Sequence, residues 1–218
     1  MQSNKIALIF DMDGVVVDNT KYHILAWQRF FKNYGRSRSR AYVVKKVLGR
    51  FNREIFKTLF KKEFSVKESR KLAEEKEALY RKLYTKAIRP LAGLSEFLKH
   101  LKSKNIKIAL ATAAPPVNVK WVLRMTGLKK YFKVIVDDTG VARGKPSPDI
   151  FLKVAKKLKI RTESCIVFED SMLGIEAANM AGMKVIGVAT SHKPKELKDT
   201  DLVIKDFKNF TLKMLEWL

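Results

Sequence analysis

Short apolar runs alternate with helical patterns along most of this chain, and this alternation limits the fold more than any other feature. Six runs rich in Ile, Val or Ala, each bounded by polar residues or glycine, predict buried strands at 6–10, 106–111, 134–136, 165–168, 185–188 and 202–204. Apolar residues at helical spacing predict helices between them at 94–104, 117–126, 148–158 and 173–181. This order favours an α/β fold, a doubly wound parallel sheet with helices on both faces.

One segment, residues 19–89, interrupts the alternation. It has no convincing strand, and its periodicity predicts helices at 22–34, 40–48, 53–60 and 67–85. We therefore expect a core domain of residues 1–18 and 90–218, with an all-helical cap domain of residues 19–89 inserted after the first strand. Two linkers between the domains would permit hinge motion. The last fifteen residues are expected to form a final helix that packs Phe207, Phe210, Leu215 and Trp217.

The chain is strongly basic, with 45 Lys and Arg, 22 Asp and Glu, and a net charge of +23. The excess is concentrated in residues 19–89, where 21 basic and 6 acidic residues give a net charge of +15. Such a field attracts phosphorylated metabolites, nucleic acid or acidic surfaces. We favour general solvation by lysine, because the sharpest cluster, "RSRSR" at 36–40, is short and lacks interleaved aromatic residues. Nucleic-acid binding is not expected, although a polyanion-binding protein on this scaffold stays an open alternative.

The number of cysteines and the lengths of the apolar runs bear on the cellular compartment in which the chain is expected. The single cysteine, Cys165, cannot form an internal disulfide, which favours a reducing compartment. The N-terminal apolar run is too short for a signal peptide, and no stretch approaches the length of a membrane span. We expect a cytoplasmic monomer without a membrane partner.

Reactive side chains follow several of the predicted strands. Ligands of open α/β sheets bind beyond the carboxyl ends of the strands, so these side chains should meet at one edge. The set consists of Asp11 and Asp13 after the first strand, Thr112 after the second, Glu169 and Asp170 after the fourth, and Lys145, just ahead of a proline-initiated helix.

The types of these residues favour phosphoryl transfer. Carboxylates from two strands form an all-oxygen pocket for a hard divalent cation, which we expect to be Mg²⁺. A lysine beside them balances a bound anion, and a threonine hydroxyl with free backbone N–H groups can hold phosphate oxygens. Taken singly, each residue has a structural interpretation, since paired aspartates often form turns and Asp170 could cap the following helix.

Four segments in order, "DMDGV", "ATA", "GKPSPD" and "FEDS", resemble the motifs of the haloacid dehalogenase superfamily of phosphohydrolases. The helical insertion resembles the subclass with a helical cap. The segments "DNTKYHILAWQRFF" and "LAEEKEALYRKLY" are similar to its beta-phosphoglucomutase-like branch. The resemblance covers essentially the whole chain and implies a Rossmann-like core of the type found in that superfamily.

The resemblance implies a role for each strand-end residue. Asp11 would be the nucleophile that forms an aspartyl-phosphate, and Asp13 the general acid and base. Thr112, Ala113 and Lys145 would bind the phosphoryl group. Mg²⁺ would be held by Asp11, Asp170 and the main-chain carbonyl of Asp13, with Glu169 in contact directly or through water. Dehalogenases of the superfamily lack the second aspartate, so Asp13 argues against dehalogenation.

In the predicted cap, the resemblance makes His23 and Lys76 candidates for contact with the substrate. A purely structural role stays open for each of them. His23 lies beside Trp27 and Phe30 and could be a packed histidine, and lysines in a charged helix such as that of Lys76 are usually solvated. Arg50 or Arg53 could supply a further contact.

After Ala113 the chain departs from the mutases of the branch, which carry polar side chains and a lysine where this sequence has Ala114, Pro115 and Pro116. These side chains cannot donate hydrogen bonds to the second phosphate of a bisphosphate intermediate. We therefore expect a Mg²⁺-dependent phosphatase of a small phosphorylated metabolite, such as a sugar phosphate. A sugar phosphate mutase is the main alternative.

Overall fold

The structure is a computed structural model that describes the backbone of residues 6–217 and the side chains of residues 6–215. The chain divides into two compact units. The first, called here the α/β unit, comprises Met1–Asp18 and Arg89–Leu218, and the second, the helical unit, comprises Asn19–Ile88. Within the described residues, no helix combines the length and apolar character needed to cross a membrane.

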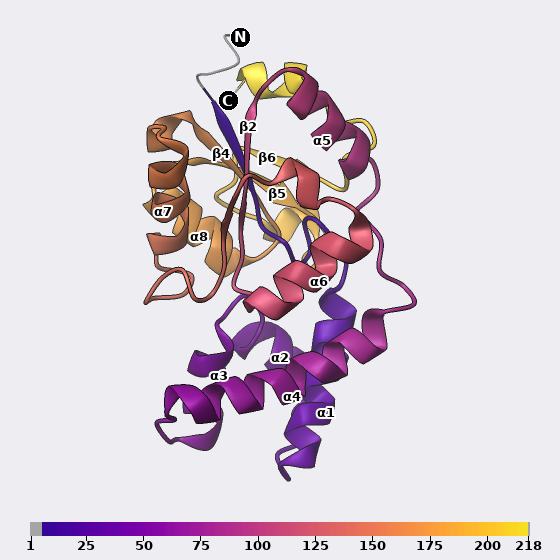
Figure 1. The fold of residues 1–218 in the computed structure, drawn as a ribbon, viewed down its shortest axis with the longest axis vertical. Helices are drawn as coiled ribbons and strands as arrows, with labels where there is room; N and C mark the ends of the chain where they lie inside the picture. Colours follow the sequence, from indigo (N-terminus) through magenta and orange to yellow (C-terminus); the bar gives the residue numbers. More distant parts are fainter. Residues whose placement is uncertain (1–5, 218) are drawn as a thin grey trace. The chain divides into compact units, whose positions relative to one another are not determined.

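The α/β unit contains a six-stranded sheet in which every neighbouring pair is parallel, in the order β3-β2-β1-β4-β5-β6 (Figure 1). The predicted parallel α/β fold is therefore confirmed, because each predicted apolar run forms a strand. The strands are β1 (Ala7–Phe10), β2 (Lys107–Ala111), β3 (Val134–Val136), β4 (Cys165–Glu169), β5 (Lys184–Val188) and β6 (Leu202–Ile204).

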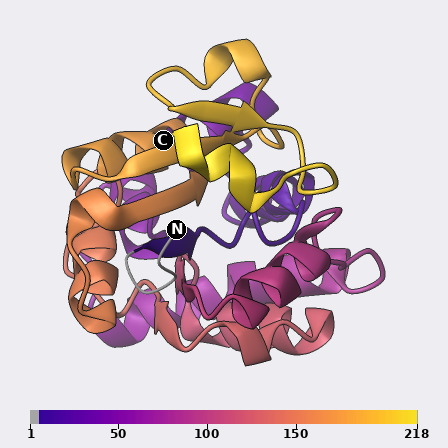
Figure 2. The same ribbon diagram turned by 90° about the horizontal axis from the view of Figure 1, so that it is seen from above.

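Helices cover both faces of this sheet (Figure 2). α7 (Asp149–Leu158) and α8 (Met172–Met180) pack on one face, and α5 (Leu94–Ser103) and α6 (Pro116–Thr126) lie on the other. Side chains alternate along each strand, so Ile9 and Val167 pack into the core beneath α7 and α8. Phe10 and Phe168 stack with a centroid distance of 4.6 Å on the side of α5.

The end of the chain differs from the predicted helix. Among the described residues of the unit, the short 3₁₀ helices are η1 (Lys129–Tyr131), η2 (Thr162–Ser164), η3 (Pro194–Glu196) and η4 (Leu212–Trp217), and η4 is the one that falls in this region. Phe207 and Phe210 are buried as expected, but they lie in turns before η4, because the amide of Phe207 donates to the carbonyl of Ala92 (2.9 Å). Leu215 is buried within η4, while the side chain of Trp217 lies outside the described residues.

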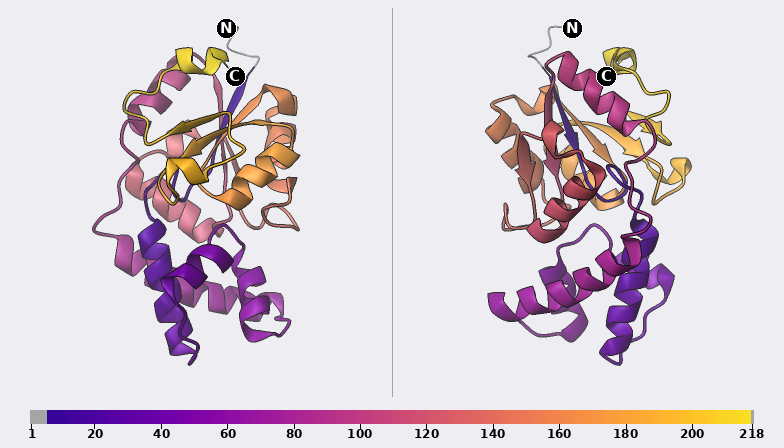
Figure 3. Two further views of the ribbon diagram at one scale, coloured as in Figure 1. Left: turned by 180° about the vertical axis from the view of Figure 1, so that it is seen from behind. Right: turned by 45° about the vertical axis from the view of Figure 1, so that its right-hand side comes forward.

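The helical unit consists of α1 (Thr20–Asn33), α2 (Arg40–Lys46), α3 (Asn52–Phe60) and α4 (Val66–Tyr84), shown in Figure 3. α4 packs against α1 and α3, and its start is fixed by a capping box between Ser65 and Glu68. Large aromatic side chains fill the core of this unit, among them Trp27, Phe30, Phe31 and Phe56. This apolar core explains how a segment with so much positive charge still folds.

The segments that leave and re-enter the α/β unit lie side by side within it. Val17 forms an antiparallel bridge with Pro90, and the amide of Leu91 donates to the carbonyl of Val16 (2.9 Å). The two linkers are therefore tied together at their core ends, and hinge motion between the units stays a prediction.

Candidate active site

The candidate site lies at the carboxyl ends of β1 and β4, the two central neighbours in the sheet. From β1 the chain continues to β2 and β3 on one side, and β4, β5 and β6 lie on the other, so the winding direction changes between β1 and β4. Asp11 directly follows β1, and its amide donates to the carbonyl of Phe168 in β4 (3.0 Å). Asp11, Glu169 and Asp170 therefore come from adjacent chain segments.

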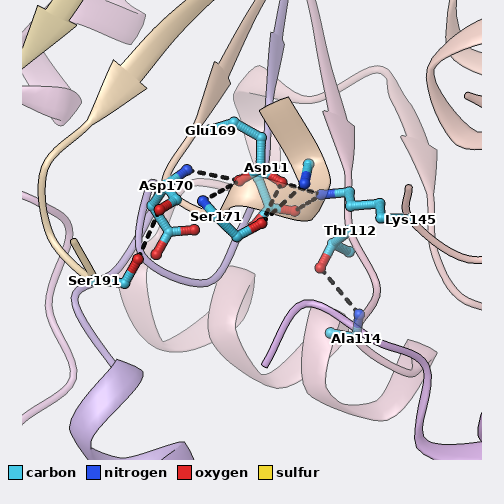
Figure 4. Close-up of polar contacts among 9 residues, drawn as sticks. Asp11, Thr112, Ala114, Lys145, Glu169, Asp170, Ser171 and Ser191 are labelled. Atoms are coloured by element: carbon cyan, nitrogen blue, oxygen red, sulfur yellow. Dashed lines mark hydrogen bonds and ion pairs between the residues drawn. The ribbon is translucent and has the colours of Figure 1, made fainter. Parts of the chain in front are cut away.

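Lys145 joins two of these carboxylates (Figure 4). Its Nζ donates to Asp11 Oδ1 (2.7 Å) and to Glu169 Oε1 (2.5 Å), and the Lys145 side chain is 2% exposed. Burial alone would lower the pKa of this lysine, but the two carboxylates outweigh that effect and raise its pKa above the usual range. Lys145 is therefore expected to be positively charged inside the site at neutral pH.

The three buried carboxylates carry more negative charge than one lysine balances. Burial, together with the charges of Glu169 and Asp13, raises the pKa of Asp11 to about 8 although Lys145 opposes the shift. Burial also raises the pKa of Asp170 well above its ordinary value, and the neighbouring charges of Glu169 and Asp11 add to that shift. Without a further cation, Asp11 and Asp170 are therefore expected to keep their protons at a higher pH than an ordinary aspartate does.

A divalent cation fits this arrangement. Within the described residues, Asp11, Glu169 and Asp170 each offer a carboxylate oxygen, and these atoms lie within 4.8 Å of one another. All three residues are buried, and oxygen ligands of this kind suit Mg²⁺. The raised pKa values of Asp11 and Asp170 identify the charge that such an ion would neutralise.

Glu169 has more partners than the other two carboxylates. Oε1 accepts from Lys145 and from the hydroxyl of Ser171 (3.3 Å), and Oε2 accepts from the amides of Asp170 (2.6 Å) and Ser171 (3.2 Å). Four donors match the four lone-pair directions of a carboxylate. A Cβ on Gly174 would come within 1.5 Å of Oε1, so this position in α8 leaves room only for glycine.

Asp170 does not cap the helix that follows it. Ser171 is the N-cap of α8, and its hydroxyl accepts from the amide of Gly174 (3.1 Å). The carboxylate of Asp170 is therefore not used for capping, which removes the structural interpretation that its position in the sequence allowed.

Gly14 makes room for the Asp170 carboxylate. Its φ of +85° lies in the left-handed region, and a Cβ there would approach Asp170 Oδ2 to 1.9 Å. The glycine that follows the two aspartates is thus required by the backbone and by the neighbouring acidic group together.

Gly14→Ala is expected to lower the free energy of unfolding by about 2–5 kcal/mol, because strain at positive φ adds to crowding of Asp170. Gly127→Ala is the matched control, since Gly127 has a φ of +69° and open space where the Cβ would be placed. Its loss should be about 1 kcal/mol, from strain alone. Urea unfolding of both variants measures the difference, and equal losses would contradict the crowding.

Asp13 and Thr112 lie at the same edge of the sheet. Asp13 forms a backbone bridge with Val17, and its charge is close enough to raise the pKa of Asp11. Thr112 is 1% exposed, and its hydroxyl accepts from the amide of Ala114 (3.1 Å) (Figure 4). This bond closes a tight turn directly after β2.

Two further residues at this edge, Thr190 and Ser191, were not predicted from the sequence. Their hydroxyls donate to the carbonyls of Gly14 (2.6 Å) and Asp170 (2.7 Å), respectively. In the sequence "VATSH", β5 ends at Val188 and is followed by Ala189, Thr190 and Ser191. The argument from strand ends that identified the other residues would therefore also have identified these two.

In the helical unit, His23 and Lys76 lie together. Lys76 Nζ is 3.0 Å from His23 Nδ1, donates to Glu77 Oε1 (2.8 Å), and lies 4.7 Å from the ring centroid of Trp27. Lys76 is 2% exposed, so it is not the solvated lysine that its charged helix suggested. The ring of His23 stacks on the ring of Tyr80, with 3.8 Å between the ring centroids, as expected for a packed histidine.

Comparison with known proteins identifies similar chains over nearly the whole length. Residues 8–188 match the family described as haloacid dehalogenase-like hydrolase. The chain is 35% identical to a phosphorylated carbohydrates phosphatase of Thermotoga maritima over 85% of this chain and 86% of that protein. It is 32% identical to beta-phosphoglucomutase of Bacillus subtilis, over 97% of this chain and 95% of the relative.

A solved structure has the same fold. The crystal structure of beta-phosphoglucomutase from Clostridium difficile superposes with a TM-score of 0.85 at 31% identity, and covers 97% of this chain and 96% of that chain.

Proposed function

Because the chain belongs to the haloacid dehalogenase-like hydrolases, in the branch that includes beta-phosphoglucomutase, we propose that it is a Mg²⁺-dependent phosphatase of a small phosphorylated metabolite. The observation that carries this proposal is the buried cluster of Asp11, Lys145, Glu169 and Asp170 at the switch point of the sheet. Similarity to the carbohydrate phosphatase of Thermotoga maritima supports a sugar phosphate as substrate.

Asp11 and Asp170, with the main-chain carbonyl of Asp13, are the proposed ligands of Mg²⁺. When bound, the ion supplies positive charge that steadies the ionised Asp11 and the phosphoryl oxygens. Glu169 is assigned a different role from direct ligation, because its oxygens already accept from four donors. It holds Lys145 and the backbone after β4 in place.

The proposed reaction proceeds in two steps on this chain's own residues. An oxygen of the Asp11 carboxylate attacks phosphorus, the bond to the substrate oxygen breaks, and the Asp13 carboxyl gives that oxygen its proton. Asp13 then takes a proton from water, the water oxygen attacks phosphorus, and the bond to Asp11 breaks to release inorganic phosphate. Lys145 would present its positive charge to the phosphoryl oxygens, since the carboxylates of this site raise its pKa.

Thr112 and Ala113 are proposed to bind the phosphoryl oxygens together with Lys145. The support is local geometry, because the bond from the Ala114 amide to the Thr112 hydroxyl turns the backbone at the end of β2. Backbone N–H groups in such a turn form a concave anion site.

His23 and Lys76 are proposed as substrate contacts of the helical unit. The ammonium of Lys76 already bonds to Glu77 and His23, which accounts for two of its three N–H groups. A third would remain for a phosphate or hydroxyl oxygen. The choice between Arg50 and Arg53 stays open, and the guanidinium of Arg53 lies 4.2 Å from the ring centroid of Phe51.

A sugar phosphate mutase is the second candidate, favoured by the 32% identity to beta-phosphoglucomutase of Bacillus subtilis. The start of α6 argues for the phosphatase. Pro116 is the first helical residue and has no N–H, while Ala114 and Pro115 carry no polar side chain. This loop therefore has few donors with which to retain a second phosphate.

A phosphate-release screen over sugar phosphates, other phosphorylated metabolites and pyrophosphate separates the two. We expect turnover of at least one sugar phosphate, with a kcat in the usual range of about 1–10³ s⁻¹, and its loss with EDTA. Incubation of glucose 1-phosphate with Mg²⁺ and a trace of glucose 1,6-bisphosphate tests the mutase. Release of no phosphate from any compound would refute the phosphatase, and formation of glucose 6-phosphate would establish the mutase.

A further inference from the structure

The loop after β5 bonds to both segments that carry the proposed metal ligands. The hydroxyl of Thr190 donates to the carbonyl of Gly14 (2.6 Å), across 176 positions of sequence. The hydroxyl of Ser191 donates to the carbonyl of Asp170 (2.7 Å). Two consecutive side chains of one loop therefore hold the backbone after β1 and the backbone after β4.

These bonds are made next to the ligands themselves. Gly14 directly follows Asp13, whose main-chain carbonyl is a proposed ligand. The carbonyl of Asp170 belongs to the residue whose carboxylate is another proposed ligand. Thr190 Oγ1 also lies 3.5 Å from Asp170 Oδ2. A hydroxyl has one hydrogen, and the shorter distance assigns it to Gly14, so the contact of Thr190 with Asp170 is one of packing.

The neighbouring structure makes the separation of the two segments critical. Gly14 lies so close to the Asp170 carboxylate that no Cβ fits between them, and the amide of Gly14 donates to the carbonyl of Val17 (2.8 Å). Mg²⁺ demands near-ideal octahedral geometry at short distances, so ligands on separate loops must be held at a fixed spacing. Hydrogen bonds behind the ligands provide that orientation in metal sites generally.

We propose that Thr190 and Ser191 are positioning residues that set the spacing between the Asp13–Gly14 segment and Asp170, and thereby the affinity for Mg²⁺. This inference rests on the proposed function. Neither side chain is a proposed ligand. The Thr190 hydroxyl donates to a backbone carbonyl. The Ser191 hydroxyl donates to the carbonyl of Asp170 and also lies within bonding reach of the Asp170 carboxylate, where it opposes the rise in the pKa of that carboxyl.

The test measures Mg²⁺ binding by isothermal titration calorimetry on the whole chain, without substrate. Thr190→Val and Ser191→Ala each remove one hydroxyl and are expected to raise the Kd for Mg²⁺ about tenfold or more. Thr190→Ser keeps the hydroxyl and should bind within about twofold of the unmodified chain. Urea unfolding of each variant reports stability separately.

Two other hydroxyls of the α/β unit provide matched controls. Thr200 donates to the carbonyl of Leu197 (3.0 Å) and Ser103 to that of His100 (2.8 Å), so each makes the same kind of bond elsewhere. Thr200→Val and Ser103→Ala should leave the Mg²⁺ affinity unchanged.

The possible results distinguish failure of this inference from failure of the proposed Mg²⁺-dependent function. An unmodified chain that binds no Mg²⁺ overturns both. If it binds Mg²⁺ while Thr190→Val and Ser191→Ala bind equally well, even with reduced stability, the two hydroxyls only brace the fold and the inference alone is wrong. Should Thr190→Val fail to fold, Ser191→Ala against Ser103→Ala decides the matter.

Discussion

Asp11→Asn is expected to reduce phosphate release by at least about 10⁴-fold, because the amide oxygen of asparagine is a poor nucleophile and removal of a nucleophile usually has effects of this size. The fold should survive the change. Burial, with smaller contributions from the charges of Glu169 and Asp13, raises the pKa of Asp11, so its charge is unfavourable in the folded chain. Thermal unfolding without Mg²⁺ should therefore show a stability equal to or above that of the unmodified chain.

Asp199→Asn makes the same chemical change at an exposed position outside the cluster, and it should retain full phosphate release. The pair of variants separates loss of the nucleophile from a general effect of replacing aspartate. Activity of Asp11→Asn within about tenfold of the unmodified enzyme would rule out Asp11 as the group that attacks phosphorus.

Lys145→Met is expected to destabilise the chain by about 3–5 kcal/mol near pH 8 in EDTA, because it leaves Asp11 and Glu169 buried without their cation. The methionine keeps most of the volume of the lysine stem, so the loss reports the charge. Phosphate release should fall sharply as well. Urea unfolding gives the stability, and Lys184→Met serves as the control, since the Lys184–Asp201 pair is at the surface and is worth at most about 1 kcal/mol.

The loss of stability in Lys145→Met should depend on pH in a defined direction. The pKa of Asp11 is about 8 in the folded chain against 3.8 as the ordinary value, so the folded state holds a proton that the unfolded state has released. The stability of the unmodified chain therefore falls as pH rises from 3.8 to about 8 and then levels off. In Lys145→Met the pKa of Asp11 is raised further, so the fall continues to higher pH. The deficit measured near pH 5 should be smaller than that near pH 8. A deficit independent of pH would indicate lost packing instead of uncompensated charge.

Much of the fold follows from local pattern. The strands are short runs of Ile, Val and Ala, and a run of this kind that is buried on both faces of a parallel sheet needs no information from the rest of the chain to be recognised. The predicted final helix was only partly correct. Phe207 and Phe210 pack into the core as their apolarity requires, yet the bond from the Phe207 amide to Ala92 holds them in turns. That partner is more than a hundred positions away in the chain.

The roles within the acidic cluster could be separated only with coordinates. Glu169 and Asp170 are adjacent in the sequence and look alike there. In the structure Glu169 is saturated by Lys145, Ser171 and the backbone, while Asp170 turns toward Gly14. Likewise, Lys76 stands among exposed charges in the sequence, and packing of α4 against α1 buries it beside Glu77 and His23.

The parallel sheet, and the strand ends at which acidic and hydroxyl side chains lie, could be predicted from the order of residues along the chain. Which of those side chains meet depends on the tertiary structure. Lys145 reaches Asp11 across 134 positions, and Thr190 reaches Gly14 across 176. Burial, which raises the pKa of Asp11, is likewise a property of the folded surroundings. Packing brings residues that are remote in the sequence within bonding distance and excludes water from the buried carboxylates. The chemistry of this site depends on both effects.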